Sequence, residues 1–349
     1  MAIRPTARDV ADESSVSLAT VSLVLNGKSG VGEETRRRVL TAMERLGYQR
    51  RGQRLVIGLL IERLPVAAFS DPTVGAMIQG VETEVGHQGY HLLLGSVEPG
   101  ANELPTMVTE RQVGGVIVLG GGDISDAYIR TLAASDVPVV LADNAVDGLA
   151  VPCVLGDNEA GAYLATRHLL DLGHRRIALL EGPRKYKPLS QRRAGYLRAF
   201  DDADLSPDPL LMIKPLHPGP RKGYRQAEAL LALPASQQPT AIVAISDKTA
   251  FGALEALKDA GLRVPDDVSL VGFDDNPDSA HIVPALTTVR LPTQAIGAIA
   301  VQRLVELIAG TDRPPSKTVL YTELVARASS GVARDATGVI AGRKEVVHA

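Results

Sequence analysis

Residues 16–27 read VSLATVSLVLNG, a largely apolar stretch in which serine and threonine recur and which ends in Asn-Gly. Val21, Val24 and Leu25 lie at helical spacing on one face, with smaller side chains between them. Ser17 stands where a helix cap is expected, and Asn-Gly signals a helix stop or a turn. We therefore expect a short helix rather than a strand, with one face on a small core and the other turned outward.

Two further helices are expected on either side of this stretch. Thr6 precedes ARDVADE with Asp9 three residues later, which is close to a capping box. Residues 33–47, EETRRRVLTAMERLG, open with acids near the positive end of a helix and carry one apolar stripe. Two short helices joined by a tight turn predict a helix-turn-helix with its second helix in a DNA major groove. A three-helix bundle that binds nothing is the alternative.

Composition places limits on the class of protein. The 349 residues, 45% hydrophobic and 22% charged, are typical of a globular chain of two or three domains. No apolar run approaches the roughly 20 residues of a membrane helix, and the polar start MAIRPTARDVADE is not a secretory signal. Cys153 is the only cysteine, which fits a reducing cytoplasm. We expect no metal site, no cofactor and no membrane partner.

Charge is unevenly distributed along the chain. Residues 1–55 hold ten lysines and arginines against six acids, whereas the remainder holds 27 against 34. A basic head on an acidic body indicates that only the head meets a polyanion. A chance fluctuation over so short a segment is the alternative.

From Val56 onward the pattern changes, because short apolar runs such as VIGLLI, GGVIVLG, PVVLAD and AIVAISD alternate with helical stretches. Near-continuous hydrophobic strands between helices predict parallel sheets covered on both faces. The region is long enough for two such sheets, each forming a lobe. Polar residues directly follow several strands, at the edge where open α/β sheets bind ligands. We therefore expect a small-molecule site in the cleft between the lobes.

Two segments of the head, RDVADESSVSLATVSLVLNG and VGEETRRRVLTAMERLGY, carry a family likeness. They resemble the DNA-binding region of the LacI/GalR family of bacterial transcription regulators and contain most of its pattern in order. The resemblance implies that residues of the second helix face DNA, namely Ser17, Leu18, Ala19, Thr20, Ser22 and Leu23, with Asn26 and Thr6 near phosphates. Further phosphate contacts are expected from Arg36, Arg37, Arg50, Arg51 and Arg54.

The sequence departs from this family pattern at three places, two of them in the head. Ser14-Ser15 replaces the usual Ala-Gly turn, and Leu23 replaces an arginine that can bind guanine bidentately. Leucine offers only apolar contact, for instance to a thymine methyl, so we expect a different operator sequence. Leu18 is apolar too, and helical spacing allows it to lie either in the core or on the DNA face.

The linker after the head is the third departure. Residues 49–55 are shorter than the family's hinge helix, lack its proline and carry Gly52, which weakens a helix. Leu55 stands where the family places a minor-groove wedge, or it starts the first strand of the body.

The body contains DNEAGAYLATRHLLDLGHRRIALLEGP and AISDKTAFGALEALKDAGLRVPDDVSLVGFDD, which are close to signatures of the same family. This part resembles periplasmic sugar-binding proteins as well. The resemblance and the choice of aromatic side chains give an expected effector site made of Phe69, Asp143, Arg192, Ser246, Asp247, Phe273 and Asp274. Carboxylates accept bonds from paired hydroxyls, and a guanidinium donates to sugar oxygens. Helix capping is the alternative role for Asp247, and a loop turn is the alternative for Asp275.

One stretch of the body is strongly basic. Between Glu181 and Asp201 lie six basic residues and no acid, which indicates either an anionic effector or a solvated basic loop. These residues are Arg184, Lys185, Lys187, Arg192, Arg193 and Arg198. Without tryptophan, any aromatic platform for a sugar must come from Phe69, Phe273, Tyr186 or Tyr224.

We therefore predict an α helix-turn-helix head, residues 1–48, a short linker, residues 49–55, and an α/β body, residues 56–331. The body would form two doubly wound parallel-sheet lobes, residues 56–160 with 290–322 and residues 161–289 with 323–331, followed by a disordered tail, residues 332–349.

The predicted function is a homodimeric, effector-controlled repressor that binds a two-fold symmetric operator in double-stranded DNA, with a carbohydrate as effector. The alternative is a sugar-binding protein of a transport system, which would leave the head unexplained. An enzyme is not expected, because the sequence lacks GxGxxG after a strand, a Walker loop and GxSxG.

Overall fold

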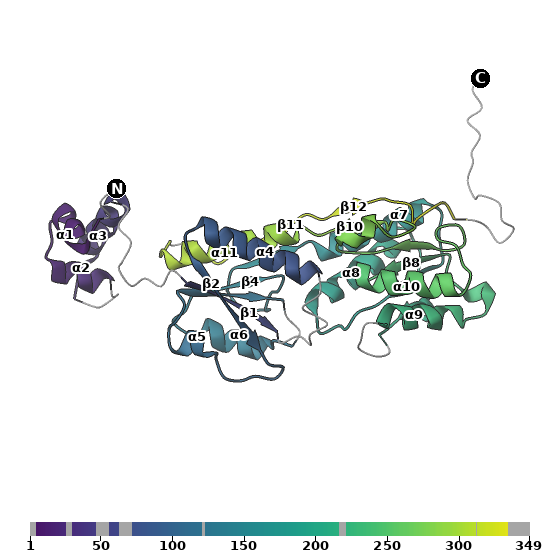
Figure 1. The fold of residues 1–349 in the computed structure, drawn as a ribbon, viewed down its shortest axis with the longest axis horizontal. Coiled ribbons are helices and arrows are strands. Elements are labelled where there is room, and N and C mark those ends of the chain that lie inside the picture. Colours follow the sequence, from purple (N-terminus) through teal and green to yellow (C-terminus); the bar gives the residue numbers. More distant parts are fainter. Residues whose placement is uncertain are drawn as a thin grey trace, which may run out of the picture. The chain divides into compact units, whose positions relative to one another are not determined.

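The computed structural model describes residues 5–25, 30–46, 56–62, 72–120, 123–215, 221–311 and 313–333. The chain forms two compact units, Met1–Leu55 and Val56–Ala349, which we call the head and the body (Figure 1). None of the helices in these ranges is long and apolar enough to cross a lipid bilayer.

The described part of the head consists of three helices, α1 (Ala7–Ser14), α2 (Leu18–Leu25) and α3 (Glu33–Leu46). The predicted capping box is present, because the Thr6 hydroxyl accepts from the Asp9 N–H at 3.3 Å and Asp9 accepts from the Thr6 N–H at 2.6 Å. Val10, Val21 and Val39, one from each helix, are fully buried and form the centre of a small core. The helix-turn-helix prediction is confirmed.

The turn between α1 and α2 depends on a long-range contact. Ser15 has φ 53° and ψ 47°, a left-handed conformation that favours glycine. The Arg38 guanidinium, on α3, donates to the carbonyl oxygens of Ser14 and Ser15 at 2.6 and 3.1 Å. This contact satisfies carbonyls at the end of α1 and holds a turn in which a serine replaces the expected glycine.

The first lobe of the body contains a six-stranded parallel sheet in the order β11-β5-β4-β3-β1-β2. Alternate strand residues lie on opposite faces, so Leu59 packs toward α4 and α11 whereas Val118 packs toward α6. The strands are β1 (Val56–Glu62), β2 (His91–Val97), β3 (Gly115–Leu119), β4 (Val139–Ala142), β5 (Cys153–Gly156) and β11 (Lys317–Leu320). Helices α4 (Pro72–His87) and α11 (Thr293–Ile308) cover one face, and α5 (Thr106–Thr109) and α6 (Asp126–Ala133) cover the other (Figure 1).

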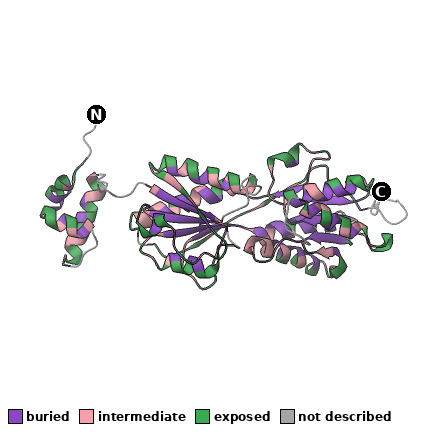
Figure 2. Cartoon of the chain, turned by 60° about the horizontal axis from the view of Figure 1, so that its bottom comes forward, coloured by how far each residue is buried: buried purple, intermediate pink, exposed green. Residues whose placement is uncertain are grey.

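The second lobe repeats this design around a four-stranded parallel sheet in the order β7-β6-β8-β9. Its strands are β6 (Ile177–Leu180), β7 (Met212–Ile213), β8 (Ala241–Ala244) and β9 (Ser269–Val271). Helices α7 (Asn158–Asp171) and α8 (Lys187–Asp201) pack on one face, and α9 (Lys222–Leu231) and α10 (Asp247–Asp259) pack on the other. Figure 2 shows the inner strands of both lobes as buried, as expected for sheets covered on both faces, whereas the edge strands β2, β7 and β11 are partly exposed.

The two lobes are joined by three crossings of the chain, after β5, before α11 and after β11. An antiparallel pair, β10 (Thr288–Arg290) with β12 (Glu323–Val325), lies beside two of these crossings. Because α7 packs on α8 and begins at Asn158, the second lobe starts slightly earlier than predicted. The predicted α/β body of two doubly wound parallel-sheet lobes is confirmed.

The end of the body differs from the predicted boundary. Ala333, which we expected in the tail, is buried, and its N–H donates to the Leu172 carbonyl oxygen at 2.9 Å. The body therefore extends at least to residue 333. The rest of the predicted tail, residues 334–349, and the linker, residues 49–55, lie outside the described residues.

Candidate DNA-binding surface and effector site

The outward face of α2 is small and mixed in polarity. Ser17, Ala19 and Ser22 are exposed, whereas Val21 and Val24 are buried against the head core. The Ser17 hydroxyl accepts from the Thr20 N–H at 3.1 Å and so acts as the predicted helix cap. The pattern of burial therefore agrees with a helix that has one face on the core and one face outward.

The two leucines of α2 contribute apolar surface to this outward face. Leu18 is 52% exposed, so of its two possible positions the structure supports the outward one. Leu23 is only partly buried. Such side chains can contact thymine methyl groups but cannot donate hydrogen bonds to guanine.

Arginines of α3 lie near the turn between α1 and α2. Arg37, Arg38 and Arg45 line a surface groove of about 530 Å³ together with Ser14 and Ser15. Thr6 is committed to the capping box, since its hydroxyl also donates to Asp9 at 2.7 Å. Asn26, Arg50, Arg51 and Arg54, which we predicted near DNA, lie outside the described residues.

In the body, Arg192 on α8 lies at the carboxyl ends of the second-lobe strands. It is 4% exposed, and its Nε donates to the Asn158 Oδ1 at 2.8 Å. Its Nη1 donates to the Ile245 carbonyl oxygen at 2.8 Å and forms an ion pair with the Asp274 Oδ1 at 2.9 Å. Asn158 belongs to the DNEAG segment, but no pattern in the sequence predicts its contact with an arginine 34 residues away.

Phe273 and Asp274 follow β9 and complete this arrangement. The guanidinium carbon of Arg192 lies 3.7 Å from the centre of the Phe273 ring, a close cation–π contact. Asp274 has φ 119°, which an L-residue rarely adopts. The structure thus brings three of the predicted effector residues into direct contact, with the arginine held in one orientation.

Asp143 approaches the same arginine from the first lobe. It follows β4 with φ 54°, and its Oδ1 is buried with no hydrogen-bond partner among the described residues. Burial raises the pKa of this carboxyl to about 6, although the positive charge of Arg192 acts in the opposite direction. A buried acceptor without a donor is costly, so this oxygen is available to a ligand.

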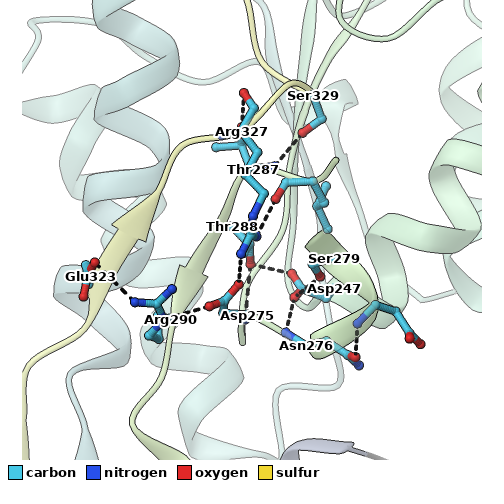
Figure 3. A network of polar contacts seen from close by, with 12 residues as sticks. Asp247, Asp275, Asn276, Ser279, Thr287, Thr288, Arg290, Glu323, Arg327 and Ser329 are labelled. Carbon is cyan, nitrogen blue, oxygen red and sulfur yellow. Dashed lines mark hydrogen bonds and ion pairs between the residues drawn. The ribbon is translucent and has the colours of Figure 1, made fainter. Parts of the chain in front are cut away.

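Asp247 has a different environment from the one predicted. Its carboxylate accepts from the Ser279 hydroxyl and the Asn276 N–H at 2.7 Å and from the Thr288 hydroxyl at 2.5 Å (Figure 3). It is fully buried, and burial raises the pKa to about 6 against these donors. Both oxygens thus accept hydrogen bonds from within the body, which supports a scaffold role for Asp247 beside the predicted effector contact.

Ser246, and not Asp247, is the residue that caps α10. Its hydroxyl accepts from the Thr249 N–H at 3.3 Å and lies 3.0 Å from the Thr249 hydroxyl. Asp275 is likewise structural, since it forms ion pairs with Arg290 at 2.7 Å and Arg327 at 2.6 Å (Figure 3). These two residues hold the loops around the site in place.

Each of the six cations in the basic stretch forms an ion pair within the protein, although two of them share one acid. Arg184 and Arg193 both pair with Glu181, and Arg198 pairs with Glu159. Lys185 and Lys187 pair with acids of the first lobe, and Arg192 pairs with Asp274. The stretch is therefore a partly exposed set of ion-paired cations.

Three of the four aromatic residues considered for a sugar platform are described, and each has a contact partner within the body. Phe273 is 2% exposed beneath Arg192, and the Tyr224 hydroxyl is bonded to Asp259 at 2.9 Å. The Tyr186 hydroxyl donates to Asp123 at 3.1 Å. Phe69 lies outside the described residues.

Comparison with known proteins agrees with both units. Residues 6–51 match the family described as bacterial regulatory proteins, lacI family, and residues 166–330 match a periplasmic binding protein-like domain. The HTH-type transcriptional regulator MalR of Streptomyces coelicolor is 38% identical over 338 residues, covering 93% of this chain and 96% of that protein.

Solved structures give the same result. A transcriptional regulator CelR–cellobiose complex has a TM-score of 0.72 at 30% identity, covering 94% of this chain and all of that one. The lac repressor dimer bound to operator and the anti-inducer ONPF has a TM-score of 0.67 at 27% identity, with the same coverage of both chains. The chain belongs to the LacI family and is a DNA-binding transcriptional regulator rather than an enzyme or a transport protein.

Proposed function

We propose that a homodimer of this chain acts in the cytoplasm on a two-fold symmetric operator and represses transcription. We further propose that a neutral carbohydrate bound between the two lobes changes its operator affinity. The observation that carries the second proposal is the arrangement of Arg192, Asp274 and the unpaired Asp143 oxygen at the carboxyl ends of strands from both lobes. The effector would contact both lobes at once, as an agent that changes their arrangement must.

The chemistry of these groups suits a polyol. The Asp143 oxygen accepts a hydroxyl proton, and the remaining N–H groups of Arg192 donate to sugar oxygens. Because Arg192 is already fixed by Asn158 and Phe273, little side-chain freedom is lost when a ligand binds.

Charge favours a neutral sugar over an acidic one. Two carboxylates, Asp143 and Asp274, lie beside one guanidinium, and the other five cations of the basic stretch are paired elsewhere. An anionic effector would meet an uncompensated carboxylate at Asp143. The CelR relative binds cellobiose, which is a neutral sugar.

The DNA-binding proposal uses the exposed face of α2. Ser17, Leu18, Ala19, Thr20, Ser22 and Leu23 would face base edges, and α3 arginines would contact phosphates. Of the α2 residues, Leu18 and Leu23 favour A·T pairs, whose thymine methyl they can contact. The lac repressor structure is a dimer on its operator, which supports the same assembly here.

Calorimetric titration with a sugar panel tests the effector proposal. We expect at least one of maltose, cellobiose and ribose to bind, with no binding of glucuronate or glucose 6-phosphate. Arg192→Lys keeps the charge but loses the planar fork, so it should weaken that sugar at least about tenfold. Arg167→Lys is the matched control, since Arg167 forms only an exposed pair with Asp171. Preferential binding of an acidic sugar would contradict the proposal.

A further inference from the structure

The loop between β6 and α8 reaches from the second lobe across to the first. Lys185 forms an ion pair with Asp123, and the Tyr186 hydroxyl donates to the same carboxylate at 3.1 Å. Lys187, the first residue of α8, forms an ion pair with Asp126 at 3.1 Å. Three consecutive residues of one lobe therefore bind two acids of the other.

The first-lobe side of this contact is built on the ends of strands. Glu62, the last residue of β1, accepts from the Asp123 N–H at 3.1 Å and so fixes the loop that carries Asp123. Lys187 also donates to the carbonyl oxygen of Ala145 at 2.5 Å, just beyond β4. The acids thus lie on the same sheet edge as Asp143.

On the second-lobe side, ion pairs and a hydrogen bond hold the loop between β6 and α8 in place. Glu181 is 2% exposed and pairs with Arg184 and Arg193, both at 3.2 Å. The Ser190 hydroxyl donates to the Arg184 carbonyl oxygen at 2.9 Å. Contacts within the second lobe therefore fix the conformation of this loop, independently of its contacts with the first lobe.

We propose that Lys185, Tyr186 and Lys187, with Asp123 and Asp126, form an ionic latch that holds the two lobes closed independently of any effector. Within the basic stretch, Lys185 and Lys187 thereby act on lobe position. Because all five residues are at least partly accessible, each ion pair is individually weak and is screened by salt. The latch shifts the balance between open and closed bodies without locking it.

The distance between the lobes is the direct test, because the latch acts on it with no effector present. Spin labels are placed on α6 and α9 of the full chain through Thr131→Cys and Arg225→Cys, with the buried native thiol removed by Cys153→Ser. Pulsed electron–electron double resonance then gives the populations of short and long distances between the two labels at low and high salt.

We expect mainly the short distance at 50 mM salt and growth of the long one at 1 M salt. The double variant Lys185→Glu with Lys187→Glu should raise the ratio of open to closed bodies by about threefold to tenfold at low salt. Lys317→Glu, which reverses an exposed charge at the start of β11, should leave the ratio unchanged. As a single substitution, Asp126→Lys should favour the open body. Combined with Lys187→Glu, which restores a pair of opposite charges, it should favour the closed body again.

Unchanged distances in the double variant and at both salt concentrations would overturn the latch. The salt series on the labelled protein leaves the five latch residues unchanged, so a latch variant that folds poorly leaves the test intact. Because no sugar is present, failure here would leave the proposed effector class standing, and failure of the sugar panel would leave the latch standing.

Discussion

At the scale of single residues, Asp143 combines three unfavourable features. Its backbone is left-handed, its Oδ1 is buried without a partner among the described residues, and its carboxyl has a pKa of about 6. Each costs stability in the free protein. Such costs are typical of residues positioned for a ligand rather than for folding.

The pH dependence of stability follows from this carboxyl. Its folded pKa of about 6 lies above the ordinary 3.8, so the folded state holds the proton more tightly and the charged form costs stability above pH 6. That cost disappears as the pH falls through 6 toward 4. Asp143→Asn should therefore stabilise the free protein by about 1–3 kcal/mol at pH 8, with the difference shrinking by pH 5.

Urea unfolding of both proteins between pH 5 and pH 8 measures this difference. Asp202→Asn, at an exposed position just after α8, serves as the control and should stay within about 0.5 kcal/mol of wild type. A loss of stability in Asp143→Asn at pH 8, or an offset that does not change with pH, would show that Asp143 is satisfied in the free protein.

At this scale the sequence predicted some residues and not others. Resemblance to a family pointed to Arg192 and Asp274, which the structure places in contact. It also pointed to Asp247, whose donors come from Asn276, Ser279 and Thr288, residues about 30 to 40 positions away in the chain. No local pattern shows which carboxylates are already occupied, because their partners are brought together only by the fold.

At the scale of elements, the turn between α1 and α2 carries strain. A left-handed non-glycine residue costs about 1–2 kcal/mol, and Ser15 is such a residue. Ser15→Gly should therefore stabilise the head by about 1 kcal/mol, and Arg38→Gln should destabilise it by a similar amount because the α1 carbonyls lose a charged donor.

Amide hydrogen exchange in the buried helices of the full chain measures these changes. Ala19→Gly is the matched control, since that position is exposed within α2 and glycine there should cost about 1 kcal/mol. Faster exchange in Ser15→Gly would contradict the account of the turn.

Periodicity was sufficient for the elements themselves. Alternation of apolar runs with helical stretches predicted both parallel sheets, because strands covered on two faces must be continuously apolar. Helix spacing predicted which face of α2 is buried, with Val21 and Val24 inward. The contact of Arg38 with the turn was not predictable, because it joins residues 23 and 24 positions apart.

At the scale of the whole molecule, the body contains a site and a separate contact that both connect the lobes. Asp143 and Arg192 approach each other from different lobes, and the latch of residues 185–187 spans them at another place. A ligand that favours one arrangement of the lobes shifts the population toward it, and the latch sets the starting balance. The charge run alone suggested an anion site or a solvated loop, because the acids that pair with Lys185 and Lys187 lie about 60 residues away in the other lobe.

The measurement that tests the central claim is fluorescence anisotropy of the full chain on DNA flanking its own gene, against random DNA and across salt, with and without the bound sugar. We predict binding to one two-fold symmetric segment at least about a thousandfold tighter than to random DNA, weakening steeply with salt. The sugar should change this affinity by about 5- to 150-fold. Equal, weak binding to both DNAs, or operator binding that the sugar leaves unchanged, would contradict an effector-controlled repressor.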